Sequence, residues 1–312
     1  MTILGTGNYQ YEEAIGWAQL PDGWDLGEVV DIAVDAQDRV YIFSRGDHPM
    51  MVFEQDGRFV TSWGEGQFTR PHGITIHEDG TLYCVDDDGH WVGIFTPEGK
   101  LLRSLGTRDE GAKYQSGDPF NRPTKVAFDP KTDDLYISDG YGNARVHKFS
   151  AGGEHLFSWG DYGTDPGEFN LPHSVCTDKD GTVYVADREN HRVQVFDDQG
   201  NFLRQWNNLH RPCGLHIDGD LVYIGQLLTQ LAHNVDYPNI GACVSIHDLD
   251  GNRLARLGDR HFGEEEGQFI APHGLAVDSR GDIYVGEVSW TGYGQFLEPP
   301  RAVKSFRKLV KI

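Results

Sequence analysis

Three histidines follow a proline at equivalent points of a repeating pattern, and three such side chains can bind a metal ion. The tripeptides are Pro71-His72-Gly73, Pro172-His173-Ser174 and Pro272-His273-Gly274. The histidines are 101 (173 − 72) and 100 (273 − 173) residues apart. The same position, which we call the slot, also occurs without histidine, in Arg122-Pro123-Thr124, in Arg211-Pro212-Cys213 and, in a degenerate first copy, in Val29-Val30-Asp31. Histidine therefore occupies every second slot.

Alternate slots converge if the repeats form a ring. In a ring of six units, every second unit is about 120° from the next, so three side chains directed at the axis meet there. Three imidazole ligands with an open fourth position are typical of catalytic zinc sites. We therefore predict a metal site formed by His72, His173 and His273, with zinc as the first choice and another divalent transition metal as the alternative.

The elements that must position these histidines are short β-strands that recur six times. Each slot is followed by an alternating apolar segment, an Asp or Gly turn and a second strand with a tyrosine, as in residues 74–83, 175–184 and 275–284. Third and fourth strands follow, and period-two alternation with such turns indicates antiparallel sheet. Four strands per repeat predict one blade of a propeller. We predict an all-β, six-bladed β-propeller forming a single domain over residues 1–312.

The sixth repeat is too short to supply all of its own strands. Its third strand is expected at residues 302–306, and too few residues follow for a fourth. Residues 10–17 resemble an edge strand, so we predict that the N-terminal strand closes the ring and removes the exposed sheet edge.

Composition limits the partners of the protein. The formal net charge is −21, whereas binding to a nucleic-acid backbone needs clustered Lys and Arg. No run approaches the roughly 20 apolar residues of a membrane span, and the first residues lack the features of a signal peptide. The four cysteines have no CxxC spacing and are expected to be reduced. We expect a cytoplasmic monomer that binds neither nucleic acid nor membranes.

A second recurring position comes after the second strand of each repeat and borders the same face as the histidines. It holds Arg45 in the first repeat and Arg188 in the fourth, which a six-fold ring places opposite each other, and Tyr141 follows it in the third. A guanidinium group donates two parallel hydrogen bonds to a carboxylate, and a tyrosine can accept a proton as a phenolate. These residues predict a small-molecule or peptide-like carboxylate substrate. Arg188 is equally compatible with a structural pairing in its turn.

The whole chain resembles NHL-repeat propellers, and its motifs resemble the peptidyl-α-hydroxyglycine α-amidating lyase family. The matching segments are residues 43–48, 138–143 and 185–190, together with Pro-His at the three slots. The resemblance implies zinc on His72, His173 and His273. It also implies catalytic roles for Tyr141, Arg45 and Arg188, with both arginines binding substrate.

The activity implied is that of a metal-dependent carbon–nitrogen lyase resembling peptidylamidoglycolate lyase. Such an enzyme cleaves an N-substituted α-hydroxy substrate to an amide or amine and a carbonyl compound such as glyoxylate. Ala271, Gly274 and Gly142 depart from the family, and Gly142 stands beside Tyr141 where the secreted relatives carry a disulfide. Ala271 stands where the family has Met, which predicts a smaller wall beside the metal. Gly274 replaces an Asp that binds structural calcium, which argues against that ion, although the Val30 carbonyl and Asp31 offer other oxygen ligands.

Two other functions fit the same sequence. An open three-histidine zinc site can deliver hydroxide to a lactone or an ester, which would make the protein a hydrolase. NHL propellers also act as non-catalytic interaction platforms, although that role does not explain histidine in alternate repeats.

Overall fold

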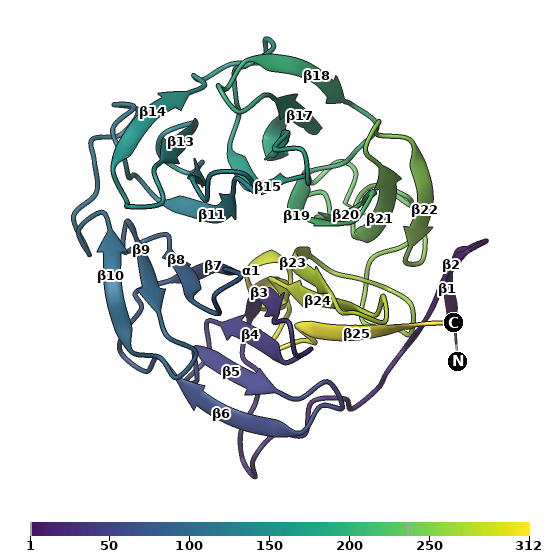
Figure 1. The fold of residues 1–312 in the computed structure, drawn as a ribbon. Helices are drawn as coiled ribbons and strands as arrows, with labels where there is room; N and C mark the ends of the chain where they lie inside the picture. The colour runs from purple at the N-terminus through teal and green to yellow at the C-terminus, as the bar shows by residue number, and fades with distance from the viewer. Residues whose placement is uncertain (1, 236) are drawn as a thin grey trace. The chain divides into compact units, whose positions relative to one another are not determined.

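The computed structural model describes residues 2–235 and 237–312 and shows an all-β, six-bladed β-propeller (Figure 1). The first three blades comprise β3 (Val29–Val34), β4 (Val40–Ser44), β5 (Met50–Phe53) and β6 (Phe59–Trp63); β7 (Pro71–Ile76), β8 (Leu82–Asp86), β9 (Trp91–Phe95) and β10 (Leu101–Leu105); and β11 (Pro123–Phe128), β12 (Leu135–Asp139), β13 (Arg145–Phe149) and β14 (His155–Trp159).

The remaining blades follow the same strand order. They comprise β15 (Pro172–Thr177), β16 (Val183–Asp187), β17 (Arg192–Phe196) and β18 (Phe202–Trp206); β19 (Pro212–Asp218), β20 (Leu221–Gln226), β21 (Cys243–Asp248) and β22 (Arg253–Leu257); and β23 (Pro272–Val277), β24 (Ile283–Glu287) and β25 (Phe306–Lys311) with β2 (Tyr9–Glu13) and β1 (Ile3–Thr6). The predicted fold class is confirmed.

The chain forms two compact units. One contains the N-terminal residues up to Glu65 together with Leu221–Ile312, and the other is Gly66–Asp220. The prediction of a single domain over residues 1–312 stays a prediction.

The core of each unit lies where neighbouring sheets face one another. In the unit of residues 66–220, one cluster joins the second and third blades through Val85, Val92 and Ile137, and another joins the third and fourth through Val146 and Val185. These side chains come from strands in which every second residue is apolar, so one face of each sheet packs on the next.

The first strand of a blade begins with a β-bulge at the slot. Pairing with the second strand shifts register between Pro71 and Gly73, and between Pro272 and Gly274. The first, third and fourth blades shift at the same point. The slot residue is therefore the extra residue of a bulge, a device that re-aims a side chain relative to the regular alternation of a strand.

A buried carboxylate at the end of the second strand fixes the chain just before the slot. Glu287, for example, accepts hydrogen bonds from the backbone N–H groups of Ile270 (2.6 Å) and Ala271 (3.0 Å). The carboxylates that do this are Asp86, Asp139, Asp187 and Glu287. In each of these blades, the last residue of the second strand thus fixes the backbone that leads into the first strand. The side chain at the slot therefore points in a defined direction.

The N-terminal strand completes the sixth blade as predicted, with two differences in the elements involved. β2 pairs with β25, with Tyr11 opposite Lys311, and β1 adds a fifth strand that the sequence analysis did not anticipate. The prediction of a strand at residues 302–306 is wrong. The strand is β25, which begins at Phe306 opposite Gly286, because residue 305 lies outside the ladder and its hydroxyl donates to Gly27 O (2.6 Å).

Helical structure in the described residues is limited to three short elements. They are the 3-10 helices η1 (Arg188–Asn190) and η2 (Gly294–Phe296) and the single-turn helix α1 (Ser289–Gly292). None of the described helices has the length and apolar character needed to cross a bilayer. All four cysteines are free thiols.

Candidate metal centre

The three slot histidines are buried and form one group of potential metal ligands. His72, His173 and His273 are 2%, 2% and 5% exposed, and their ligand nitrogens all lie within 4.8 Å of one another. Neutral imidazole nitrogens suit zinc and other divalent transition metals, and a buried group of three leaves a further coordination position for substrate or water. The cluster can therefore bind a metal ion.

A hydrogen bond to the next blade fixes the tautomer of each histidine. The Nδ1 atoms contact the backbone carbonyl oxygens of Thr124 (2.8 Å from His72), Cys213 (3.2 Å from His173) and Val30 (2.7 Å from His273). A carbonyl oxygen can only accept a hydrogen bond, so Nδ1 carries the proton and Nε2 carries the lone pair that a metal needs. The three slots without histidine thus contribute carbonyl groups that orient the other three.

The glycines that follow two of the histidines make these hydrogen bonds possible. A Cβ atom on Gly73 would lie 2.3 Å from the Thr124 oxygen, and one on Gly274 would lie 2.6 Å from the Val30 oxygen and 2.2 Å from Asp31 Oδ1. A side chain at either position would collide with the group that accepts the hydrogen bond. The close approach of the neighbouring strand therefore explains why residue 274 is glycine in this chain.

Tyr141 contacts two of the three histidines. Its hydroxyl lies 3.3 Å from His72 Nε2 and 3.2 Å from His173 Nε2, and both imidazole rings meet the phenol ring edge to face. The same hydroxyl is 3.5 Å from an Nη atom of Arg188. The structure thus brings together four of the residues predicted from the sequence, with the phenol oxygen beside the metal-binding nitrogens.

Arg188 belongs to a triad in which two buried arginines share the half-buried carboxylate of Glu189. Its Nε atom donates to Glu189 (2.8 Å), and Glu189 also accepts two hydrogen bonds from Arg211 (2.9 and 3.1 Å). Burial alone would raise the pKa of Glu189, but Arg211 and Arg188 lower it to about 2. Burial works against the charge on Arg188, yet Tyr141, Cys213 and Glu189 keep its pKa raised. The triad carries one net positive charge, which suits an anionic ligand.

Arg122 lies on the face of the Tyr141 ring. Its guanidinium carbon is 4.6 Å from the ring centroid, within the range of a cation–π contact. The same guanidinium forms ion pairs with Asp87 (3.2 Å) and Asp88 (2.9 Å), and Arg70 also pairs with Asp87. Asp87 is fully buried, so these ion pairs hold Arg122 against the ring.

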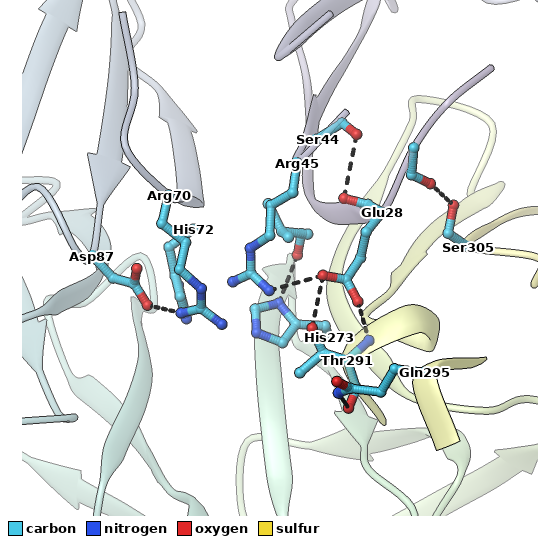
Figure 2. A network of polar contacts seen from close by, with 12 residues as sticks. Glu28, Ser44, Arg45, Arg70, His72, Asp87, His273, Thr291, Gln295 and Ser305 are labelled. Carbon is cyan, nitrogen blue, oxygen red and sulfur yellow. Dashed lines mark hydrogen bonds and ion pairs between the residues drawn. The ribbon is translucent and has the colours of Figure 1, made fainter. Parts of the chain in front are cut away.

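Arg45 is tied to a buried glutamate (Figure 2). Its Nη1 atom donates to Glu28 Oε2 (3.0 Å), and Glu28 also accepts hydrogen bonds from the N–H (2.6 Å) and hydroxyl (2.9 Å) groups of Thr291 in α1. A backbone hydrogen bond joins Arg45 N to Glu28 O (2.9 Å). The predicted position of Arg45 opposite Arg188 stays a prediction.

The side chain of Ala271 is covered by α1. It is 1% exposed, and a Cβ atom on Gly292 would lie 3.3 Å from its methyl group. The smaller residue at this position therefore leaves room for α1 to pack on it, and the predicted smaller wall beside the metal stays a prediction.

Sequence reasoning missed Glu28, Arg122, Arg211, Glu189 and Asp87. The first three share a position, since each stands directly before the residue that precedes a slot without histidine. That recurrence was a usable signal. Apart from the ion pair between the neighbours Arg188 and Glu189, the contacts were not visible in the sequence, because they join residues of different blades or distant parts of one blade.

Comparison with known proteins agrees with this fold. Residues 120–149 and 169–196 match the NHL repeat. NHL repeat-containing protein 3 from Homo sapiens is 35% identical over 300 residues, which cover 89% of this chain and 81% of that protein. Among solved structures, a protein of unknown function from Bacteroides thetaiotaomicron aligns with a TM-score of 0.63 at 17% identity, covering 99% of this chain and 76% of its own.

Amidating enzymes are also among the relatives. Peptidyl-glycine alpha-amidating monooxygenase from Mus musculus is 32% identical over 316 residues, which are 90% of this chain but 31% of that protein. Peptidyl-alpha-hydroxyglycine alpha-amidating lyase 1 from Drosophila melanogaster is 29% identical over 75% of this chain and 45% of its own length. The chain thus spans less than half of these enzymes. It belongs to the family of NHL-repeat propellers that includes NHL repeat-containing protein 3 and is related to the peptidyl-α-hydroxyglycine α-amidating lyases.

Proposed function

We propose that the protein is a metal-dependent lyase, with zinc as the expected metal. The substrate is an N-substituted α-hydroxyglycine or a similar carbinolamide, and the products are an amide or amine and a carbonyl compound such as glyoxylate. The observation that carries the proposal is the position of the Tyr141 hydroxyl, 3.2 and 3.3 Å from the Nε2 atoms of two buried histidines. A base at this point is beside any group that reaches the metal position.

Each of the site residues has a separate role in the proposed reaction. A divalent ion on the three Nε2 atoms would supply Lewis-acid activation of the substrate hydroxyl. Tyr141 accepts the proton of that hydroxyl, the oxygen lone pair forms the C=O bond, and the C–N bond breaks with its electron pair on nitrogen. Tyr141 then returns the proton to the nitrogen, so atoms and charge balance. Arg188 holds the substrate carboxylate, and Arg45 supports the developing carbonyl.

The charge around Tyr141 supports a carboxylate substrate. Arg188 and Arg211 share one carboxylate, that of Glu189, so the three groups together carry one net positive charge. The carboxylate of a substrate would be attracted to this positive charge. The carbonyl product, glyoxylate in the case of an α-hydroxyglycine, would still carry the carboxylate.

The first test is metal content together with turnover. Protein purified without chelator or affinity metal should contain one transition-metal ion, measured by elemental analysis, and His72→Ala, His173→Ala and His273→Ala should each lose it. His261→Ala is the matched control because His261 is exposed and outside the cluster. Wild-type protein should release glyoxylate from an N-acyl-α-hydroxyglycine.

The outcomes separate the alternatives. If the His173→Ala variant contains no metal and keeps full activity, the metal-dependent mechanism is wrong. Metal without glyoxylate release, but with turnover of lactones or esters, would identify a hydrolase. Wild-type protein with neither metal nor turnover would favour an interaction propeller.

A further inference from the structure

The residue two positions before each slot, which we call the flanking residue, carries a charge in the three blades without a slot histidine. These residues are Glu28 in the first blade, Arg122 in the third and Arg211 in the fifth. In the blades with histidine they are Arg70, Leu171 and Ala271. Glu28 and Arg211 are each 8% exposed, and a buried charge needs a partner that explains it.

The partner of Arg211 is the carboxylate that also holds Arg188. Arg211 contacts Glu189 through both Nε and an Nη atom, which fixes the carboxylate in the plane of the guanidinium group. Glu189 in turn accepts from Arg188 Nε at 2.8 Å, so that the Nη groups of Arg188 lie toward Tyr141. Arg211 therefore sets the orientation of Arg188 through the carboxylate that the two arginines share.

The partner of Arg122 is the ring of Tyr141. The guanidinium group lies on one face of the ring, and Asp87 and Asp88 hold it there. The backbone of both arginines is also held, since Arg122 N–H donates to His90 Nδ1 (3.1 Å) and Arg211 N–H donates to His191 Nδ1 (3.2 Å). Both have left-handed backbone angles, with φ of 67° and 44°, which a non-glycine residue adopts only where its surroundings require it.

The partner of Glu28 is Arg45. Figure 2 shows the Glu28 carboxylate directed to Arg45 on one side and to Thr291 on the other. Both carboxylate oxygens are used, so the group cannot rotate without losing a hydrogen bond to α1. The guanidinium group of Arg45 is thereby held in one direction.

We propose that Glu28, Arg122 and Arg211 are positioning residues, each dedicated to one residue of the reaction: Glu28 to Arg45, Arg122 to Tyr141 and Arg211 to Arg188. This inference rests on the proposed lyase function for the roles of the three residues they hold. The repeat thus uses alternate slots for metal ligands, and the flanking residues of the other slots to aim the groups that act on substrate.

The inference predicts different kinetic effects for the three positions. Arg211→Met should raise KM, because Arg188 binds the substrate carboxylate. Arg122→Met and Glu28→Gln should lower kcat by roughly ten- to a hundredfold with little change in KM, the loss that misplacement of a reacting group brings. Metal content should stay at the wild-type level in all three, which a general loss of structure would not allow. Arg58→Met is the control, since Arg58 forms an exposed ion pair elsewhere.

Double-mutant cycles give the decisive measurement. If Arg211 acts through Arg188, the effect of Arg211→Met should nearly vanish in an Arg188→Lys background, and likewise for Arg122→Met in Tyr141→Phe and Glu28→Gln in Arg45→Lys. Additive losses in these pairs would overturn the inference, as would loss of metal in the single variants.

A binding readout keeps this test separate from the lyase proposal. If the wild-type protein releases no glyoxylate from the substrate, the proposed function fails. The role of Arg211 is then tested by calorimetry, which measures the affinity of zinc-loaded protein for glyoxylate. Binding weakened by Arg211→Met in the wild-type background, and not in Arg188→Lys, supports the inference. Unchanged or undetectable binding in wild type and Arg211→Met alike overturns it for this position.

Discussion

At residue 141, removal of the phenol oxygen tests whether Tyr141 acts as a base or only packs against its neighbours. Tyr141→Phe keeps the ring, and with it the edge contacts to His72 and His173 and the stacking with Arg122. We expect kcat to fall by about 10²- to 10⁴-fold, the usual contribution of a general base, while metal content is unchanged. Activity within twofold of wild type would remove Tyr141 from the mechanism.

The slots without histidine allow a second test at this scale. Cys213 contacts His173 Nδ1 through both its backbone carbonyl (3.2 Å) and its Sγ atom (3.3 Å), and the carbonyl contact remains when the side chain is removed. The thiol is buried, and burial raises its pKa to about 12, so it is protonated at neutral pH. Cys213→Ala should therefore keep a full complement of metal by elemental analysis. Loss of metal in this variant, comparable to that in His173→Ala, would show that the sulfur is a ligand.

Individual residues of the candidate site were predictable where the repeat makes their phase visible. His72, His173 and His273 stand out because a fixed spacing places them in alternate repeats. Glu28 did not stand out, because its partners Arg45 and Thr291 are 17 and 263 residues away and no local pattern connects them.

At the scale of the strand, the bulge at His273 brings residue 274 into close contact with β3, which leaves room only for glycine. Gly274→Ala would place a methyl carbon 2.2 Å from Asp31 Oδ1 and 2.5 Å from its Cα, so β3 or β23 must shift. We expect a loss of about 1 to 3 kcal/mol in unfolding free energy, as for other overpacked positions. Chemical denaturation measures this, and Gly152→Ala is the control because the nearest atom to its added methyl is 3.5 Å away. Equal stability of the two variants would contradict the steric argument.

Two histidines, one just before β19 and one within it, make the stability of the folded protein depend on pH. Burial lowers the pKa of His210 and of His216 to about 4, whereas an unfolded histidine titrates near 6.5. Below pH 6.5 the unfolded chain binds protons that the folded protein does not, so stability falls as pH decreases from about 6.5 to 4, by at most about 1.4 kcal/mol per pH unit for each group. Denaturation midpoints between pH 8 and 4.5 should show this, and His216→Gln should flatten the curve. An unchanged slope in that variant would exclude His216 as a source.

The strands themselves were largely predictable, because alternation and turns recur in every repeat. The sixth blade was less so. Residues 10–17 were expected to form the closing strand, but β2 ends at Glu13, and Trp17 instead packs on Phe53 and Tyr284. An aromatic residue in an alternating segment fits a strand and a core equally well, and tertiary contacts decide between them.

For the molecule as a whole, closure of the sixth blade is the feature with the largest expected effect on stability. β2 covers the edge of β25, buries Tyr11 completely and contributes Glu13 to a buried ion pair with Arg307. Deleting residues 2–13 should therefore lower the Tm and promote aggregation through the exposed strand edge. Deleting residues 2–8, which removes β1 alone, should have a smaller effect. Differential scanning calorimetry distinguishes the two, and equal Tm values would show that β2 is unimportant for closure.

The pairing of β2 with β25 also sets an order of events during synthesis. β2 is synthesised long before β25, the strand with which it pairs, so β2 has only β1 to pair with until residues 306–311 have been made. The blades with sequential strands can form earlier, since their hairpin contacts are local. The hairpin of β1 and β2 therefore lacks its partner β25 while the first five blades are synthesised, and that interval is when a chaperone or a neighbouring nascent chain has its best access to it.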